Sequence, residues 1–160
     1  MTTKLQIAKH FLYPSSLYVS RDPHLVTTVL GSCIAVCLFD PKEKAGGINH
    51  YMLPLWNGEG LASVKFGNIA IEKLIEEMEL RGSDRKNLYA KLFGGASQVN
   101  YSMQIGQRNI EIARKLLIEN NINIVAESVG GSQGRKIIFN TYTGEVRMKY
   151  VSSVVNYNIQ

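Results

Sequence analysis

Cys33 and Cys37 are the side chains of this sequence most able to supply a nucleophile. They lie in the segment Gly31-Ser-Cys-Ile-Ala-Val-Cys-Leu-Phe39, whose aliphatic and β-branched residues favour a strand. Four strand residues span about 13 Å, whereas a disulfide needs Cα atoms within about 7 Å. We therefore expect two free thiols, as in a reducing compartment. The spacing of the pair and the small number of histidines also argue against a metal site.

The two cysteines occupy different positions in this predicted strand. Cys37 lies in its middle, where a free cysteine is usually a small buried hydrophobic residue. Cys33 lies where Gly31-Ser32 turns into the strand, so its thiol can reach solvent. Backbone N–H groups that are not yet paired in a sheet adjoin the thiol there and could hold an oxyanion. Alternation along the strand puts both cysteines on one face, opposite Ile34 and Val36.

A nucleophilic cysteine needs a base, and the base needs a group that orients it. His50 lies 17 residues after Cys33, on a segment predicted to return as the neighbouring strand. Pairing of these two strands would bring His50 back to Cys33. His10 and His24 lie in a lead-in segment and a turn, so His50 is the preferred base. A buried structural role is the alternative for this histidine.

Thr27 and Thr28 precede Cys33 on another predicted strand and could orient the imidazole through a hydroxyl or a carbonyl. Because the two threonines are adjacent, the sequence leaves the choice between them open. Ser32 is a weaker candidate for the nucleophile, since no Gly-x-Ser-x-Gly motif surrounds it.

The segments that must position these residues have a mixed α/β pattern. We expect a single domain over residues 1–160, with β-sheets and flanking helices. The predicted strands are residues 5–13 and 16–20 (or an irregular lead-in), 25–30, 33–39, 46–53, 88–93, 122–127, 136–140 and 145–151, and the predicted helices lie at 71–78 and 110–117.

Two glycine pairs, Gly94-Gly95 and Gly130-Gly131, follow the predicted strands 88–93 and 122–127. Each pair could serve a turn that needs positive φ, or both could bring bare backbone to one site. Neither pair belongs to a Gly-x-x-x-x-Gly-Lys-Ser/Thr or Gly-x-Gly-x-x-Gly pattern, which argues against a phosphate-binding loop.

Composition restricts the class of protein further. The chain has 160 residues, 45% of them hydrophobic, and a net charge of +5. It has no apolar run of roughly 18 residues that could cross a membrane, and Lys4 and Lys9 interrupt the apolar residues of the N-terminus. We therefore expect a cytoplasmic protein. Lys and Arg occur at most in pairs, which argues against a nucleic-acid-binding footprint.

Several longer segments resemble a known family. These are Val26-Thr-Thr-Val-Leu-Gly-Ser-Cys-Ile-Ala-Val-Cys-Leu-Phe-Asp-Pro41, Gly46-Gly-Ile-Asn-His-Tyr-Met-Leu-Pro54, Ala90-Lys-Leu-Phe-Gly-Gly-Ala96, Ile105-Gly-Gln-Arg-Asn109, Gly130-Gly131, Gly134-Arg-Lys136 and Thr143-Gly144. In order and over nearly the whole chain, they resemble the chemoreceptor glutamine deamidase family, CheD. Residues 97–102 look less typical of the family.

The resemblance implies a layered cysteine-hydrolase fold like that of bacterial toxin deamidases. It also implies a Cys–His–Thr triad, which falls by position on Cys33, His50 and Thr27, with Thr28 as the adjacent alternative. Gly31 and Ser32 would then supply or adjoin the oxyanion donors.

The implied activity is hydrolysis of receptor glutamine side chains to glutamate and ammonia, with no cofactor and with methylesterase activity chemically open. The implied partners are the cytoplasmic domains of chemoreceptors and a CheC-type phosphatase. The alternative is a non-catalytic adaptor that binds these same proteins.

Overall fold

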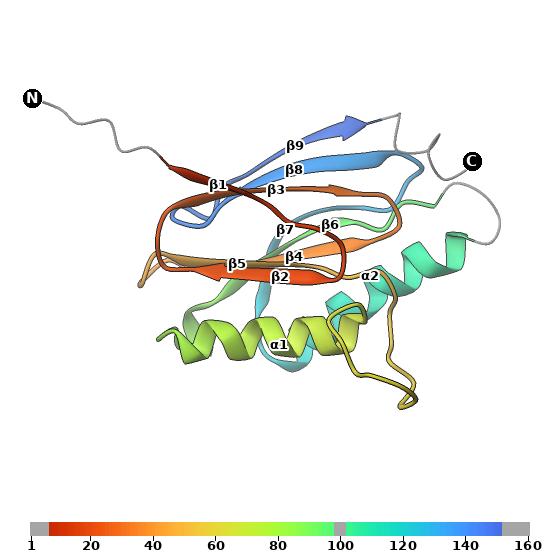
Figure 1. Ribbon diagram of the computed structural model, residues 1–160, viewed down its shortest axis with the longest axis horizontal. Coiled ribbons are helices and arrows are strands. Elements are labelled where there is room, and N and C mark those ends of the chain that lie inside the picture. The colour runs from red at the N-terminus through yellow and green to blue at the C-terminus, as the bar shows by residue number, and fades with distance from the viewer. Residues whose placement is uncertain (1–6, 98–101, 152–160) are drawn as a thin grey trace, which may run out of the picture.

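Two β-sheets stack face to face, and two helices cover the outer face of one of them (Figure 1). The computed structural model describes residues 7–97 and 102–151, so predicted positions 5 and 6 and most of the atypical segment 97–102 lie outside the described residues. The first sheet has the order β1 (Ala8–Phe11), β3 (His24–Leu30), β8 (Gly134–Asn140) and β9 (Val146–Val151). The second has the order β2 (Ser16–Ser20), β5 (Ala45–His50), β4 (Ile34–Asp40), β6 (Tyr89–Gly94) and β7 (Asn123–Val129).

Strand β4 lies in the middle of the second sheet, and all seven of its residues are buried. Ala35 and Cys37 face the first sheet and join the apolar cluster between the sheets. Ile34 and Leu38 face the helices and join a larger cluster. The predicted alternation is therefore confirmed, and the strand reads as a continuous apolar run because both of its faces are covered.

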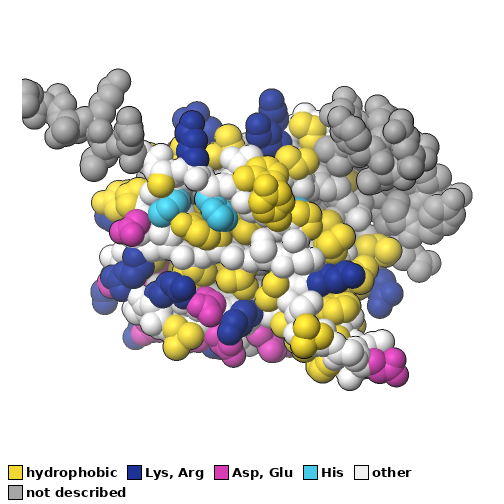
Figure 2. Space-filling view, in the orientation of Figure 1, with side chains coloured by type: hydrophobic (Ala, Val, Ile, Leu, Met, Phe, Trp, Pro, Cys, Tyr) yellow, Lys and Arg dark blue, Asp and Glu magenta, His cyan; other side chains and the backbone are white. Residues whose placement is uncertain are grey.

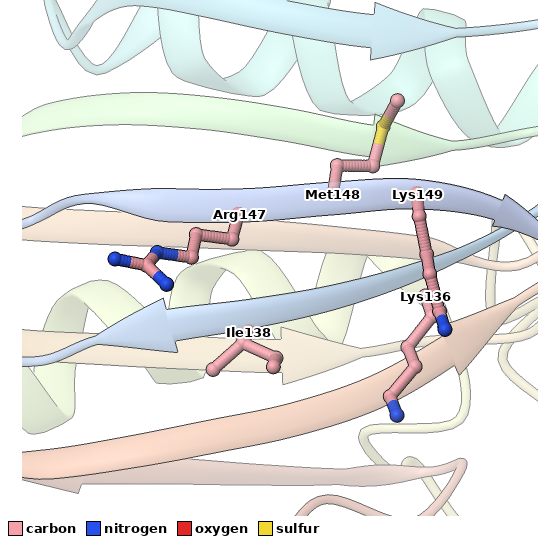
Figure 3. Close-up of a pocket in the computed structure, with 5 residues that line it drawn as sticks. All are labelled: Lys136, Ile138, Arg147, Met148 and Lys149. Atoms are coloured by element: carbon pink, nitrogen blue, oxygen red, sulfur yellow. The ribbon is translucent and has the colours of Figure 1, made fainter.

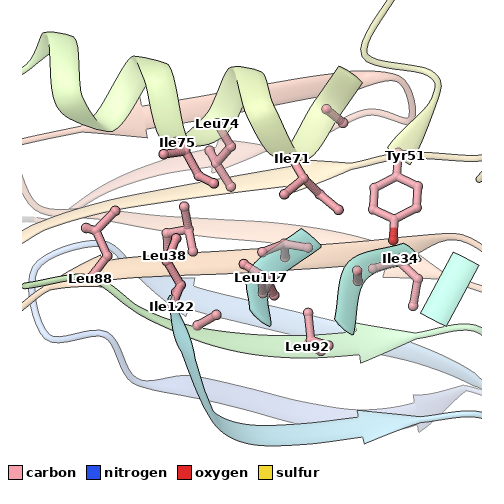
Figure 4. Close-up of a cluster of buried hydrophobic side chains, with 14 of the residues drawn as sticks. Ile34, Leu38, Tyr51, Ile71, Leu74, Ile75, Leu88, Leu92, Leu117 and Ile122 are labelled. Carbon is pink, nitrogen blue, oxygen red and sulfur yellow. The ribbon is translucent and has the colours of Figure 1, made fainter. Parts of the chain in front are cut away.

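Helices α1 (Gly67–Leu80) and α2 (Ser102–Glu119) form the outer layer, and a short 3-10 turn at Arg85–Asn87 follows α1. Figure 4 shows Ile71, Leu74 and Ile75 of α1 above β4, with Leu117 of α2 in the same cluster. The prediction of a layered α/β sandwich is confirmed. No helix in the described ranges is long and apolar enough to cross a membrane.

Both helices are longer than their apolar periodicity predicts. Helix α1 begins at Gly67, where a Cβ atom would lie only 2.7 Å from the ring of Tyr51. Helix α2 begins at Ser102, and its first half is too polar to show a periodic stripe. Yet Asn109 in that half is completely buried, because the helix passes over the ends of β4 and β5.

Candidate active site

Cys33 directly precedes β4 and His50 is the last residue of β5, so both lie at the same end of the second sheet. Ile34 pairs with Tyr51 through two backbone hydrogen bonds of 3.1 and 3.0 Å. Antiparallel pairing then puts Cys33 opposite Met52, which makes Cys33 and His50 diagonal neighbours. Ile34 and Tyr51 point toward the helices, so by alternation Cys33 and His50 point into the layer between the sheets.

The backbone of His50 is held on both sides. On one side the N–H of Ser15 donates to the carbonyl of His50 at 2.8 Å. On the other, Asn49 inserts its side chain between β4 and β5: Oδ1 accepts from the N–H of Val36 at 2.9 Å, and Nδ2 donates to the carbonyl of Ala70 at 3.1 Å. The buried Asn49 amide thereby replaces a ladder bond and fixes the strand beside the histidine.

The His50 ring is oriented by a hydrogen-bonded chain from the first sheet. Thr28 Oγ1 lies 2.7 Å from His50 Nδ1 and donates its own proton to the carbonyl of Leu12 at 2.8 Å. Because the hydroxyl proton is used on Leu12, Thr28 Oγ1 accepts from Nδ1–H. This arrangement favours the tautomer that leaves Nε2 free to act as a base.

Thr28, and not the preferred Thr27, contacts the histidine. Along β3 the residues Val26, Thr28 and Leu30 are buried, while Thr27 lies half exposed on the opposite face. The carbonyl of Thr27 accepts from the N–H of Leu12 at 2.8 Å, so Thr27 helps to hold the residue that orients Thr28. The contact with His50 that the resemblance implied for Thr27 is therefore made by Thr28, the alternative that the sequence left open.

Burial keeps both reacting groups neutral. Desolvation raises the pKa of the Cys33 thiol to about 11, although the N–H of Cys33 itself opposes this shift. Desolvation also lowers the pKa of His50 to about 4. At neutral pH the pair therefore consists of a thiol and a neutral imidazole, so any reaction of the sulfur as a thiolate requires removal of the thiol proton. This arrangement favours general-base chemistry over a preformed thiolate–imidazolium pair.

The loop before Cys33 has its carbonyls tied down on one side. Gly31 and Cys33 accept from the N–H groups of Ala96 and Gly95, each at 2.9 Å. A Cβ atom on Gly94 would collide with the carbonyl of Cys33, so glycine is required for this close approach. No cis peptide bond occurs in the described residues. In each trans peptide of this loop the N–H therefore points opposite to the carbonyl of the preceding residue, so the N–H of Ser32 points away from the contact between Gly31 and Ala96.

The two glycine turns meet beside this loop. The N–H of Gly130 donates to the carbonyl of Gly94 at 2.9 Å, and the N–H of Ser97 donates to the carbonyl of Gly131 at 2.8 Å. Parallel pairing of β6 and β7 brings the turns together, since both follow the same end of adjacent strands. Both predictions for the glycine pairs are confirmed: the two turns lie side by side, and all four glycines have positive φ.

Cys37 is buried in the cluster between the sheets, as predicted, and desolvation raises its pKa far above the ordinary range. We expect Cys37→Ala to leave the reactivity of Cys33 toward iodoacetamide within twofold of wild type and to cost about 1 kcal/mol of stability. Mass spectrometry of native protein should place the alkyl group on Cys33 alone. Alkylation of native protein at Cys37 would contradict this assignment.

His50 makes the stability of the fold depend on pH. Its pKa is about 4 in the folded chain and about 6.5 when unfolded. Between these values the unfolded chain binds a proton that the folded chain does not, so stability falls as pH falls from 6.5 toward 4. The loss amounts to on the order of 3 kcal/mol. Urea unfolding of wild type and His50→Gln over this range should show the difference; parallel pH profiles would refute it.

Sequence reasoning did not assign a role to Asn109 or to the carbonyl of Leu12. Asn109 belongs to the family-like motif Ile105-Gly-Gln-Arg-Asn109, and its presence in that motif could have marked it as a candidate. The carbonyl of Leu12 left no signal, because any residue carries one. Among the described residues, no cluster of three or more His, Cys, Asp or Glu is placed to hold a metal ion.

Comparison with known proteins identifies the family. A family model described as "CheD chemotactic sensory transduction" matches residues 52–150. A probable chemoreceptor glutamine deamidase CheD of Sulfurimonas denitrificans is 50% identical over 151 residues, covering 92% of this chain and 97% of that protein. Its counterpart from Trichlorobacter lovleyi is 51% identical, covering 88% and 89%.

Among solved structures, hypothetical protein YfiH of Bacillus licheniformis aligns with a TM-score of 0.42 and 14% identity, over 69% of this chain and 49% of that one. A similarity at this level carries no conclusion about the chain. The relatives match nearly end to end, and their identity over that length is far above what a shared fold alone would explain. The chain belongs to the CheD family.

Proposed function

We propose that this chain is a deamidase that converts glutamine side chains of chemoreceptors to glutamate. The observation that carries the proposal is the hydrogen-bonded chain from Leu12 through Thr28 to His50, which favours an unprotonated Nε2 on a residue diagonal to Cys33 in the strand register. The relatives are named probable chemoreceptor glutamine deamidases, and these names suggest the substrate.

In the proposed first half-reaction, His50 Nε2 takes the proton of the Cys33 thiol while Sγ attacks the glutamine Cδ. The N–H groups of Cys33 and Ser32 hold the resulting oxyanion. His50 then returns the proton to the leaving nitrogen, so ammonia departs and a γ-glutamyl thioester remains on Cys33. Thr28 keeps Nδ1 protonated throughout and stabilises the transient imidazolium.

In the second half-reaction, His50 deprotonates a water molecule that attacks the thioester carbonyl. Collapse of this intermediate breaks the C–S bond, returns the proton to Cys33 and releases glutamate. A γ-glutamyl methyl ester would form the same acyl-enzyme with methanol as the leaving group, so we include methylesterase activity in the proposal. No step calls for a metal or an organic cofactor.

Charge on the first sheet would favour an acidic partner. Lys136, Arg147 and Lys149 line a pocket on β8 and β9 together with Ile138 and Met148 (Figure 3). Lys136 and Lys149 are direct cross-strand partners, and like charges at such positions repel each other. On the face shown in Figure 2, cations are scattered, with acidic side chains among them. We propose that this cationic pocket attracts glutamate-rich receptor helices.

The cytoplasmic domains of receptors are the proposed substrate, and a CheC-type phosphatase is the proposed regulatory partner in the cytoplasm. The test is to incubate the protein with a receptor cytoplasmic fragment and to map glutamines whose mass rises by about 1 Da, the difference that replaces –NH2 by –OH in the proposed chemistry. Cys33→Ala should show no shift, and Cys37→Ala should match wild type. Binding of the fragment by wild-type protein without any shift would favour the adaptor alternative and refute the deamidase.

A further inference from the structure

Asn109 connects helix α2 to both strands that carry the reacting residues. Its side chain is completely buried. Nδ2 donates to the carbonyl of Ser32 at 2.9 Å and to the carbonyl of Met52 at 3.0 Å. The backbone carbonyl of Asn109 in turn accepts from Tyr51 Oη at 2.5 Å. One amide nitrogen therefore links Ser32, which precedes Cys33, to Met52, which lies opposite Cys33.

The contact with Ser32 fixes a peptide group of the nucleophile loop. The carbonyl of Ser32 and the N–H of Cys33 belong to the same planar peptide, and a trans peptide points them in opposite directions. By holding the carbonyl toward α2, Asn109 directs the N–H of Cys33 away from the helix. The same N–H lowers the pKa of the Cys33 thiol, although desolvation outweighs it.

The contact with Met52 keeps the two strands together at their ends. Met52 follows the last bridge between β4 and β5, the one that joins Ile34 to Tyr51. Beyond that bridge, the strand that carries His50 and the loop that carries Cys33 are joined through the amide of Asn109. Asn109 therefore adds a side-chain link to the backbone pairing that places Cys33 and His50 as diagonal neighbours.

We propose that Asn109 is a positioning residue that aims the N–H of Cys33 at the developing oxyanion. This inference rests on the proposed function, because it assumes acyl transfer to Cys33. An amide suits the position, since its nitrogen has two protons for two carbonyls and a carboxylate has none. Asn109→Asp would keep the size of the side chain while it sets oxygen against oxygen.

Two reactions of Cys33 separate oxyanion stabilisation from thiol reactivity. Acylation by p-nitrophenyl acetate passes through an oxyanion, whereas alkylation by iodoacetamide displaces iodide without one. We expect Asn109→Ala and Asn109→Asp to lower the ratio of acylation rate to alkylation rate by about 10-fold or more, since loss of one oxyanion donor costs about 100-fold or more in well-studied hydrolases. Asn109→Ser, which keeps a donor, should lie between these variants and wild type.

Leu117→Ala is the matched control, because it removes a buried side chain from the same helix at a position in the apolar cluster. It should lower the melting temperature and leave the ratio of the two rates unchanged. If the ratio is unchanged in all three Asn109 variants, or if Leu117→Ala lowers it equally, the inference is wrong.

The assay uses no receptor, so its outcome is separable from that of the proposed function. A changed ratio in a protein that fails to deamidate receptors would refute the substrate and support the positioning role. Deamidation with an unchanged ratio would refute the positioning role alone.

Discussion

Replacement of His50 by glutamine is expected to lower kcat/KM for receptor deamidation at pH 7 by about a thousandfold or more. The reason is the raised pKa of Cys33, about 11, which leaves only about one thiol in ten thousand ionised at pH 7. Wild-type protein avoids this deficit because the imidazole removes the proton during attack. In the variant only the small fraction of Cys33 that is already ionised can react.

The pH dependence of the two proteins should therefore differ in shape. Activity of His50→Gln should rise about tenfold per pH unit between pH 7 and 10, as the thiolate population rises toward its pKa. Wild-type activity should be nearly flat over the same range, because His50 titrates near pH 4. His24→Gln is the matched control on a partly exposed histidine. A flat profile for His50→Gln would show that His50 is not the base.

Replacement of Thr28 by valine should lower kcat by about 10- to 100-fold, since a lost hydrogen bond to a buried polar group costs about 1–3 kcal/mol. Valine keeps the shape of threonine but removes the oxygen that accepts from His50 Nδ1. The ring then loses the contact that favours a free Nε2. Nitrogen-15 NMR of His50 should show a shift in the balance of tautomers together with the fall in kcat.

Thr27→Val is the control for this prediction, because the neighbouring side chain is half exposed and points to the other face of β3. Its activity should stay within about twofold of wild type, as for most surface substitutions. If Thr27→Val lost more activity than Thr28→Val, the orientation of β3 derived from burial would be wrong. Equal losses would indicate a general effect on the strand.

The sequence by itself determined the class of fold and two of the three proposed site residues. Alternation around Cys33 and Cys37 predicted a strand with both cysteines on one face, and that face is the one between the sheets. The position of His50 on a return strand follows from local pairing around a short turn. Local rules of this kind hold because period-2 alternation and hairpin geometry do not depend on distant contacts.

The sequence could not decide between Thr27 and Thr28, and the reason is the composition of β3. Leu25 and Val29 share a face with Thr27, while Val26 and Leu30 share a face with Thr28, so both faces are equally apolar. Which of them is buried depends on the second sheet, whose side chains cover Val26 and Leu30.

Tertiary structure also decided the charge state of the site and the position of Asn109. The pKa values of Cys33 and His50 shift mainly through desolvation, a property of everything that surrounds them. Asn109 lies 76 residues beyond Cys33 in the chain and reaches its loop only because α2 packs across the ends of β4 and β5. The sequence alone shows which residue types could perform the chemistry. The protonation states and orientations of these side chains depend on long-range packing, which local sequence patterns do not reveal.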